Sequence, residues 1–175
     1  LAGDVSGRRV LVIGAGPIGL LVVAAAVHAG AAVVGASDVR AEPLERAQAL
    51  GAGEVALVGR DTIDPESYDV VFECSGVGAA LTQAVRAARR AGTVVQVGML
   101  PNTEIGVNLA PMLAKELTIR GAFRFSTEID DAVRLLAESD ALDPVVSHVI
   151  PASDAVRAFE LARDSSASAK VLLSL

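Results

Sequence analysis

Short apolar runs alternate with longer segments of helical character along most of the chain. The first run is Val10–Ile13, short enough for a buried strand, and a nearly apolar segment from Pro17 to Ala29 follows it. The same alternation predicts strands at Ala32–Ala36, Glu54–Val58, Asp69–Glu73, Thr93–Val97 and Glu116–Arg120, and helices at Glu42–Leu50, Gly78–Ala91 and Ala110–Ala114. Strands that alternate with helices are typical of a parallel, doubly wound α/β sheet with helices on both faces.

The pattern changes after residue 124, so we predict a domain over residues 1–124 and a separate C-terminal segment over residues 125–175. Thr127–Glu138 has the spacing of an amphipathic helix, with Ile129, Val133 and Leu136 on its inward face. The rest of the segment predicts a strand, a helix and a strand at Val145–Ile150, Ser153–Arg163 and Ala169–Leu173.

A glycine-rich turn, GAGPIG at residues 14–19, joins the first strand to the first helix. In this G-x-G-x-x-G pattern, Gly14 turns the chain, Gly16 lets a pyrophosphate approach the backbone, and Gly19 lets the helix lie close to the strand. The helix N-terminus offers unpaired N–H groups to that pyrophosphate, and Pro17 in its first turn loses no hydrogen bond. The pattern predicts a dinucleotide site; the alternative is a βαβ unit whose glycines only turn the chain.

Asp38 follows the second predicted strand, nineteen residues after Gly19. A carboxylate at this position can accept hydrogen bonds from both hydroxyls of an adenosine ribose, and it repels a 2′-phosphate. We therefore expect NAD rather than NADP. Cys74 and Ser75 follow another strand, at the edge where open parallel sheets hold their ligands.

Composition narrows the possible partners. The net charge is −6, and the two lysines and thirteen arginines form no basic stripe, so nucleic acid is not expected. Glycines and small residues interrupt every apolar stretch that approaches the length of a membrane span, and no signal peptide is recognised. The single cysteine excludes an internal disulfide and favours a reducing cytoplasm. Because the chain begins at Leu1, we expect it to be part of a longer protein.

Several longer motifs resemble the medium-chain, zinc-type alcohol dehydrogenases, over their cofactor-binding part and C-terminal return segment. The matching stretches are GAGPIGLL, ASDVRAEPLERAQALGA, DVVFECSG, GTVVQVGM, KELTIRGAFRFSTE and AFELARDSSASAKVLL. Within that family, GAFRFSTE and VQVGM are similar to the forms in polyol and sugar-acid dehydrogenases, the L-idonate 5-dehydrogenases first and the sorbitol dehydrogenases next.

The resemblance implies roles for individual residues. It assigns the pyrophosphate to the glycine turn, including Pro17 and Ile18, and the ribose to Asp38. Further cofactor contacts would come from Val97, Gly98 and Met99 beside the nicotinamide, Ala122 and Phe123 at its carboxamide, and Lys170 near the pyrophosphate. Many members carry a base about five residues after the acid. Pro43 stands there in this chain, so either Arg40 replaces that contact or the contact is absent.

The resemblance also implies a catalytic zinc ion, held by an N-terminal domain that this chain lacks. Cys74, His28 and His148 are too far apart in sequence to replace its ligands, so we expect no metal and no catalytic residue here. The function implied is oxidation of a polyol or sugar acid by hydride transfer to NAD. Alternatives are a threonine or simple alcohol dehydrogenase, or a module that senses NAD(H) without catalysis. The family also implies a homodimer or homotetramer that pairs through the strand near residues 116–121.

Other polar residues have plainer interpretations. His28 is expected to interact with a helix dipole, His148 to pack within a strand, and Cys74 to be a small buried side chain. Glu73 is expected to be a solvated or structural acid. Arg124 could bind a sugar-acid carboxylate, or could equally form a surface ion pair.

Overall fold

The computed structural model describes residues 2–125, 128–138, 140–164 and 166–175. The chain divides into two compact units, Leu1–Arg124 and Phe125–Leu175, and each is described by itself. Within the described residues, no helix is long and apolar enough to cross a membrane.

The first unit is built on a six-stranded parallel sheet. Its order is β3-β2-β1-β4-β5-β6, which reverses between β1 and β4 as in dinucleotide-binding folds. The strands are β1 (Arg9–Ile13), β2 (Val33–Asp38), β3 (Glu54–Leu57), β4 (Tyr68–Glu73), β5 (Ala88–Gln96) and β6 (Thr118–Gly121). This sheet confirms the predicted doubly wound α/β class.

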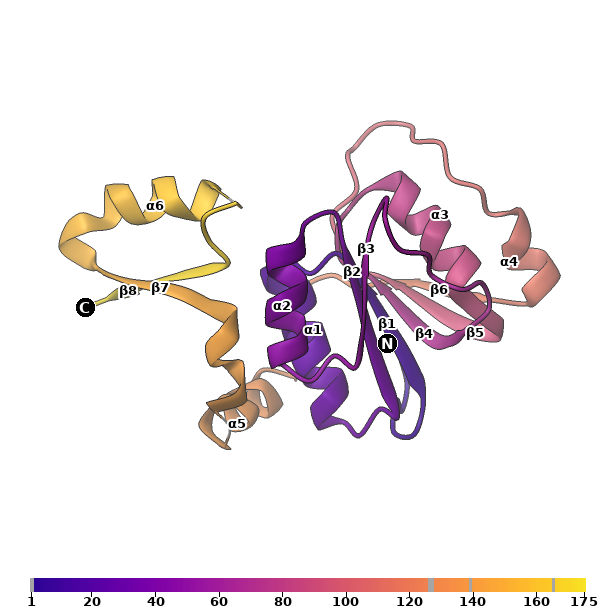
Figure 1. Ribbon diagram of the computed structural model, residues 1–175, viewed down its shortest axis with the longest axis horizontal. Coiled ribbons are helices and arrows are strands. Elements are labelled where there is room, and N and C mark those ends of the chain that lie inside the picture. Colours follow the sequence, from indigo (N-terminus) through magenta and orange to yellow (C-terminus); the bar gives the residue numbers. More distant parts are fainter. Residues whose placement is uncertain (1, 126–127, 139, 165) are drawn as a thin grey trace. The chain divides into compact units, whose positions relative to one another are not determined.

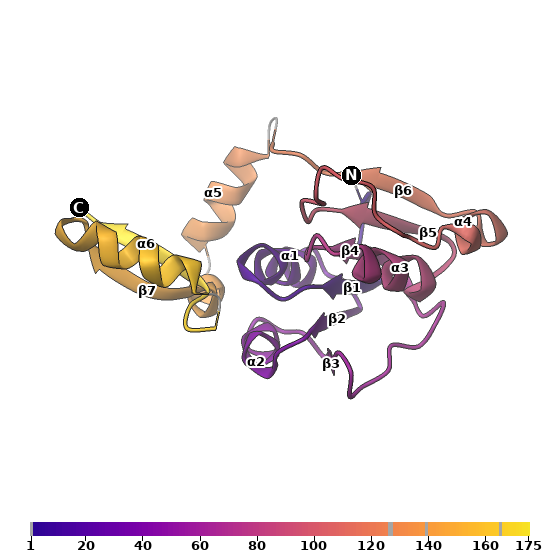
Figure 2. The same cartoon turned by 90° about the horizontal axis from the view of Figure 1, so that it is seen from above.

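Helices cover both faces of the sheet (Figures 1 and 2). On one face lie α1 (Pro17–His28) and α2 (Ala41–Ala49), and on the other lie α3 (Gly78–Ala87) and α4 (Ala110–Lys115). On the α3 face, Leu11 and Val71 of the sheet pack with Leu81 and Val85 of the helix in one buried cluster. Burying this apolar surface fixes the sheet, and therefore the positions at which its strands end.

The predicted helix over Gly78–Ala91 is too long. α3 ends at Ala87, and Ala88 already pairs with Tyr68 as the first residue of β5. The cause is the buried ammonium group of Lys115, which donates hydrogen bonds to the carbonyl oxygens of Val85 (2.6 Å), Arg86 (3.1 Å) and Ala88 (2.5 Å). The last carbonyl groups of a helix have no N–H partner within the helix, and a positive charge is favoured at this end. The Lys115 ammonium supplies both the donors and the charge, so the helix ends here.

The last strand of the sheet begins later than predicted. Glu116 has a positive φ of 54° and closes α4, so β6 starts at Thr118 rather than at residue 116. β6 pairs with β5 on one side and lies at the edge of the sheet.

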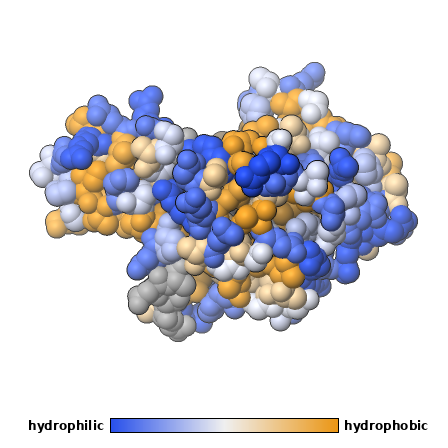
Figure 3. Space-filling model, viewed as in Figure 1, coloured by the Kyte–Doolittle hydropathy of each residue, from blue (hydrophilic) through white to orange (hydrophobic). Residues whose placement is uncertain are grey.

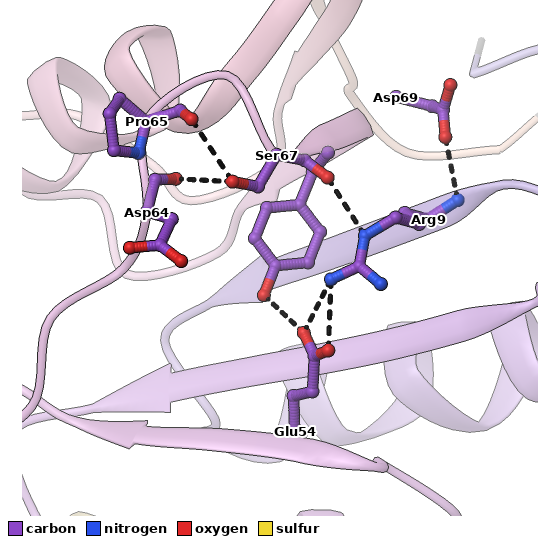
Figure 4. Close-up of polar contacts among 7 residues, drawn as sticks. Arg9, Glu54, Asp64, Pro65, Ser67 and Asp69 are labelled. Atoms are coloured by element: carbon purple, nitrogen blue, oxygen red, sulfur yellow. Dashed lines mark hydrogen bonds and ion pairs between the residues drawn. The ribbon is translucent and has the colours of Figure 1, made fainter.

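A polar cluster lies at the amino ends of β1, β3 and β4 (Figure 4). The Arg9 guanidinium donates to both carboxylate oxygens of Glu54 (2.9 and 3.0 Å), and the Tyr68 hydroxyl donates to the same carboxylate at 2.7 Å. Desolvation by burial, with the hydrogen bond to Glu54, raises the pKa of Tyr68 to about 12. The cluster joins three strands at their amino ends. The glycine turn lies at the other end of the sheet, after the carboxyl end of β1.

The second unit contains a two-stranded parallel sheet of β7 (Val146–Pro151) and β8 (Lys170–Ser174). Its helical elements are α5 (Ile129–Glu138), η1 (Asp140–Val145), η2 (Ala152–Asp154) and α6 (Ala155–Arg163). The predicted inward stripe of α5 is wrong: Ile129, Val133 and Leu136 are about half exposed or more, because no described residue of the second unit covers that face. Hydrophobic side chains also reach the surface elsewhere in this unit, including Val156 and Phe159. Hydrophobic surface is visible on this unit in Figure 3. Thr127, the predicted first residue of the helix, lies outside the described residues.

Candidate functional site

The candidate site lies where the strand order reverses, at the carboxyl ends of β1 and β4. Gly14 follows β1 with a φ of +90°, a conformation that glycine adopts without strain. A Cβ at Gly14 would lie 2.8 Å from the backbone nitrogen of Ser75, which follows β4. The two loops are therefore packed together, and the predicted residues of both motifs meet at one crevice.

Gly16 and Gly19 differ in what surrounds them. A Cβ at Gly19 would lie 1.8 Å from the carbonyl oxygen of Gly14, so the absence of a side chain lets α1 pack on β1. A Cβ at Gly16 would meet no protein atom within 4 Å. Gly16 also forms the N-cap of α1 without any side-chain hydrogen bond to the first turn. Backbone N–H groups at this helix end are therefore open to an anion such as a pyrophosphate.

Asp38 ends β2 beside the glycine turn. Its carboxylate accepts hydrogen bonds from the backbone N–H groups of Ala15 (2.8 Å) and Arg40 (3.0 Å). The Arg40 side chain lies 4.0 Å from the same carboxylate. Each carboxylate oxygen has a further lone pair that can accept from a ribose hydroxyl. The geometry thus fits the predicted partnership of an acid with the glycine turn.

Glu73 organises the loops after β4 and β5. This fully buried carboxylate accepts a hydrogen bond from the backbone N–H of Ser75 (2.7 Å) and further bonds from the Ser75 hydroxyl and the Gln96 amide. The Gly76 N–H also donates to it, at 3.1 Å. Glu73 is therefore a structural acid and is not solvated. Its hydrogen bonds fix the loop after β4 and the end of β5 relative to each other.

The predicted nicotinamide-lining stretch lies in the loop that follows β5. The N–H groups of Val97 and Gly98 both donate to the Glu73 backbone carbonyl at 2.8 Å. A Cβ at Gly98 would lie 2.2 Å from the backbone nitrogen of Gly76, so the β4 and β5 loops touch along their backbones. Met99 is 82% exposed at the end of this stretch. The loops form one packed ledge at the carboxyl edge of the sheet.

A cavity of about 480 Å³ opens beside the glycine turn and Asp38. Its floor includes Ile13, Ser37 and Ala56, from the carboxyl ends of three strands. Its walls come from the start and face of α3 and from the segment after β3: Val77, Ala79, Ala80, Gln83 and Arg86, and Val58, Gly59, Asp61, Thr62 and Ile63. The size is within the range of cofactor and small-molecule sites. Sequence reasoning missed these wall residues, because they belong to no motif and come together only in the fold.

Cys74 is a partly buried free thiol. Burial, with the adjacent negative charge of Glu73, raises the pKa of Cys74 to about 12. His28 ends α1, and His148 lies in β7 with its Nδ1 3.0 Å from the Ser147 hydroxyl. Across the ranges that the structure describes, no three His, Cys, Asp or Glu side chains are grouped to hold a metal ion. Within these ranges, the side chains therefore do not form a zinc site.

The remaining predicted residues lie elsewhere. Ala122 follows β6, and its N–H donates to the carbonyl of Gln96 at 2.8 Å. The Arg124 guanidinium lies 5.1 Å from the centre of the exposed Phe123 ring, at the end of the first unit. Lys170 begins β8 in the second unit and is exposed.

Comparisons with known proteins place this arrangement among dehydrogenases. Residues 17–138 match the family described as zinc-binding dehydrogenase. The chain is 33% identical over 178 residues to L-idonate 5-dehydrogenase (NAD(P)(+)) of Escherichia coli, covering 98% of this chain and 52% of that protein. The crystal structure of the E. coli enzyme superposes with a TM-score of 0.91 at 32% identity, over 99% of this chain and 52% of that one.

Two further relatives extend the comparison. Sorbitol dehydrogenase of Gallus gallus is 35% identical over 170 residues, covering 91% of this chain and 48% of that protein. A zinc-binding dehydrogenase structure from Sinorhizobium meliloti, bound to NADP, has a TM-score of 0.83 at 29% identity and covers 99% of this chain and 54% of that one. The chain thus spans about half the length of the relatives that it matches.

Proposed function

We propose that this chain, which belongs to the zinc-binding dehydrogenase family, is the NAD(H)-binding part of an enzyme that oxidises a polyol or a sugar acid. The observation that carries the proposal is the geometry around Gly16. The open space at its Cα lies at the uncapped N-terminus of α1, beside a carboxylate at the end of β2. A dinucleotide requires this combination, because its pyrophosphate needs N–H donors and its ribose needs acceptors.

In this proposal the residues of the chain hold the cofactor and contribute no proton transfer. The α1 N-terminus binds the pyrophosphate, and the Asp38 carboxylate accepts from the adenosine ribose. The nicotinamide ring lies against the ledge of Val97, Gly98 and Met99, with Ala122 and Phe123 at its carboxamide. When bound, the nicotinamide supplies the hydride acceptor. Glu73 positions this ledge through its bonds to the β4 and β5 loops.

We propose NAD as the preferred cofactor. The Asp38 carboxylate would face the 2′-phosphate of NADP, and two negative charges placed side by side repel each other strongly. Names of relatives include both cofactors: NAD(P)(+) for the E. coli enzyme and bound NADP for the S. meliloti structure. Arg40, the nearest base, already lies beside Asp38 and partly offsets its charge. The preference is therefore a property to be measured on this chain.

The substrate class follows from the relatives rather than from a site in this chain. L-idonate and sorbitol dehydrogenases support a polyol or sugar acid, with L-idonate the first candidate and Arg124 the residue proposed to bind its carboxylate. We assign any zinc ion to the part of those relatives that this chain does not span. The chain alone should then bind cofactor without turnover. We also expect a cytoplasmic protein that binds neither nucleic acid nor membranes.

Two other functions remain candidates. A threonine or simple alcohol dehydrogenase would keep the same cofactor site and change only the substrate. An NAD(H)-sensing module would bind the cofactor without any catalytic partner. Both share the proposed cofactor chemistry, so the full-length protein is needed to separate them.

The decisive experiment titrates the 175-residue chain with NADH by fluorescence and follows NADH absorbance with a panel of polyols, aldonates, ethanol and threonine. We expect saturable binding without turnover by the chain, and oxidation of L-idonate or a polyol by the full-length protein. Absence of NADH binding would contradict the proposed cofactor function. Turnover by the 175-residue chain would contradict the assignment of catalysis to the part of the relatives that this chain does not span. Turnover of threonine or ethanol, without turnover of any polyol or aldonate, would contradict the proposed substrate class.

A further inference from the structure

The 480 Å³ cavity extends beyond Asp38, the residue proposed to bind the ribose, to residues of α3. One stripe of α3, formed by Ala79, Gln83 and Arg86, lines it at the i, i+4, i+7 spacing of a single helix face. At 1.5 Å rise per residue this stripe extends for about 10 Å along the helix. The opposite wall is the segment from Val58 to Ile63. The cavity is therefore a groove that continues from Asp38 along α3.

The mouth of the groove is apolar on two sides. Val39, directly after Asp38, and Val77, directly before α3, both line the cavity and expose much of their surface. A planar ring bound at this end of the groove would bury apolar surface against these side chains. Gln83 lies on α3 six residues after Val77, one to two helix turns further along the groove.

Three polar side chains of the groove, those of Asp38, Asp61 and Ser75, already have partners. The Asp61 carboxylate accepts from the Arg60 guanidinium (3.0 and 3.1 Å) and from the Leu57 N–H (2.9 Å), and the Ser75 hydroxyl is bonded to Glu73. The Gln83 side-chain amide is half-buried and makes no hydrogen bond to any residue that the structure describes. Among the described residues that line the groove, it is the one planar group that carries both a donor and an acceptor.

We propose that Gln83 recognises the adenine base of the bound dinucleotide through its edge. The inference rests on the proposed cofactor function and adds a base-specific contact to it. The Gln83 carbonyl oxygen accepts from the exocyclic amine N6 of adenine, and its amide N–H donates to the ring nitrogen N7. Glutamine forms this two-bond pair with the N6/N7 edge of adenine. Hypoxanthine carries a carbonyl oxygen in place of the amine and cannot make the first bond.

Arg86 provides a contrast within the same groove. Its guanidinium offers donors and no acceptor, so it can bond to the hypoxanthine oxygen but not to the adenine amine. The preference for adenine must then come from Gln83 rather than from Arg86. Replacing Gln83 by methionine keeps the length of the side chain and removes both hydrogen-bonding groups.

The test compares the affinities of NADH and its hypoxanthine analogue, reduced nicotinamide hypoxanthine dinucleotide, by fluorescence titration. For the unmodified chain we expect NADH to bind about tenfold more tightly, within the range of one base-edge pair. Gln83→Met should reduce that ratio to about one by weakening NADH binding. Gln48→Met makes the same chemical change on the exposed face of α2, outside the groove, and should leave the ratio unchanged.

The outcomes separate this inference from the function on which it rests. If the unmodified chain binds neither dinucleotide, the proposed cofactor function fails. If it binds NADH and the Gln83→Met variant keeps the original ratio, the cofactor function stands and the role of Gln83 is wrong. Equal affinity of the unmodified chain for both dinucleotides also overturns it. Circular dichroism of the variant establishes that α3 is intact, so a loss of folding is not mistaken for a loss of recognition.

Discussion

The Asp38 carboxylate accepts a 2.8 Å hydrogen bond from the backbone N–H of Ala15, which ties the end of β2 to the glycine turn after β1. The two residues are 23 positions apart in sequence. The bond holds the carboxylate at the crevice while its remaining lone pairs stay available to a ligand. A change at Asp38 therefore alters both the charge of the site and the anchoring of the turn, and experiments must separate the two.

Asp38→Ser combined with Val39→Arg should shift cofactor preference from NADH toward NADPH by about tenfold or more, because like-charge repulsion of a phosphate costs several kcal/mol. Asp38→Asn keeps one oxygen acceptor for the Ala15 N–H, removes the charge and gives up the bond from the Arg40 N–H, so it should produce part of the shift while the glycine turn stays anchored. Fluorescence titrations with both cofactors measure the ratio. Glu42→Gln removes a nearby charge from the first turn of α2 and should leave the ratio unchanged; a similar shift in that variant would reduce the effect to net charge.

Two glycines of the turn should respond in opposite ways to alanine. Gly16→Ala meets no protein atom, so the free energy of unfolding should change by less than about 1 kcal/mol, while NADH affinity falls by about tenfold or more because the new methyl group fills the pyrophosphate space. Gly19→Ala places a Cβ 1.8 Å from the Gly14 carbonyl oxygen and should destabilise the fold by roughly 3 kcal/mol. Denaturant unfolding and NADH titration measure both effects. Normal NADH binding by Gly16→Ala would argue against a pyrophosphate at this position.

Lys115→Met should destabilise the first unit by about 3 kcal/mol, because it leaves the buried carbonyl oxygens of Val85 and Ala88 without their charged donor. Burial lowers the pKa of Lys115, and the charge of Glu66 opposes that shift. Lys170→Met, at the exposed start of β8, is the matched control and should change the unfolding free energy little. Chemical denaturation of both variants decides the matter. Equal stabilities would mean that the carbonyls find other donors.

Lys115 also marks a limit of what the sequence could predict. Short apolar runs located each strand of the main sheet to within a few residues, except the early part of β5, because such a run is a local property of the sequence. The end of α3 depends on a side chain 30 residues away from Val85, and the alanine-rich segment contains no local stop signal before Gly92. In the site, the glycine turn and Asp38 were predictable because their spacing is itself the motif. Gln83 was not, since its neighbours in the groove come from separate elements.

The second unit shows a related limit. The spacing of Ile129, Val133 and Leu136 correctly predicted that they share one helix face, and α5 forms there. Periodicity states which residues share a face, but whether another element covers that face is a tertiary property. These side chains are exposed in this chain. A pattern of this kind predicts the helix and leaves its partner undetermined.

Stability should depend on pH through the cluster at the amino edge of the sheet. The hydrogen bond from the Tyr68 hydroxyl, together with Arg9, lowers the pKa of Glu54 below its ordinary value of 4.5. An acid with a lowered pKa in the folded state stabilises the fold above its unfolded pKa and loses that contribution as the pH falls through the folded value. Glu54→Gln should therefore reduce stability at neutral pH and flatten its decline below pH 4.5. Urea unfolding across this range, with the exposed Glu45→Gln as control, measures the difference; parallel curves would contradict it.

The exposed edge of the sheet should pair two copies of the chain. β6 bonds to β5 on one side, and an open edge offers its outer N–H and C=O groups to another strand. Pairing with a second β6 about a two-fold axis is self-complementary and would continue the sheet across the dimer. We therefore expect a dimer at tens of micromolar, roughly the range in which such contacts persist, as the family resemblance also implies.

Proline substitutions can separate the two sides of β6. The Ala122 N–H donates inward to the Gln96 carbonyl, and backbone groups alternate along a strand, so the N–H of Gly121 points outward and that of Thr118 points inward. Gly121→Pro should convert the dimer to a monomer while largely preserving stability. Thr118→Pro removes a bond within the sheet and should destabilise the first unit. Light scattering gives the mass and denaturant unfolding the stability of each variant. A dimer that persists in Gly121→Pro would place the contact elsewhere, and a monomeric unmodified chain would show that this edge does not pair copies of the chain alone.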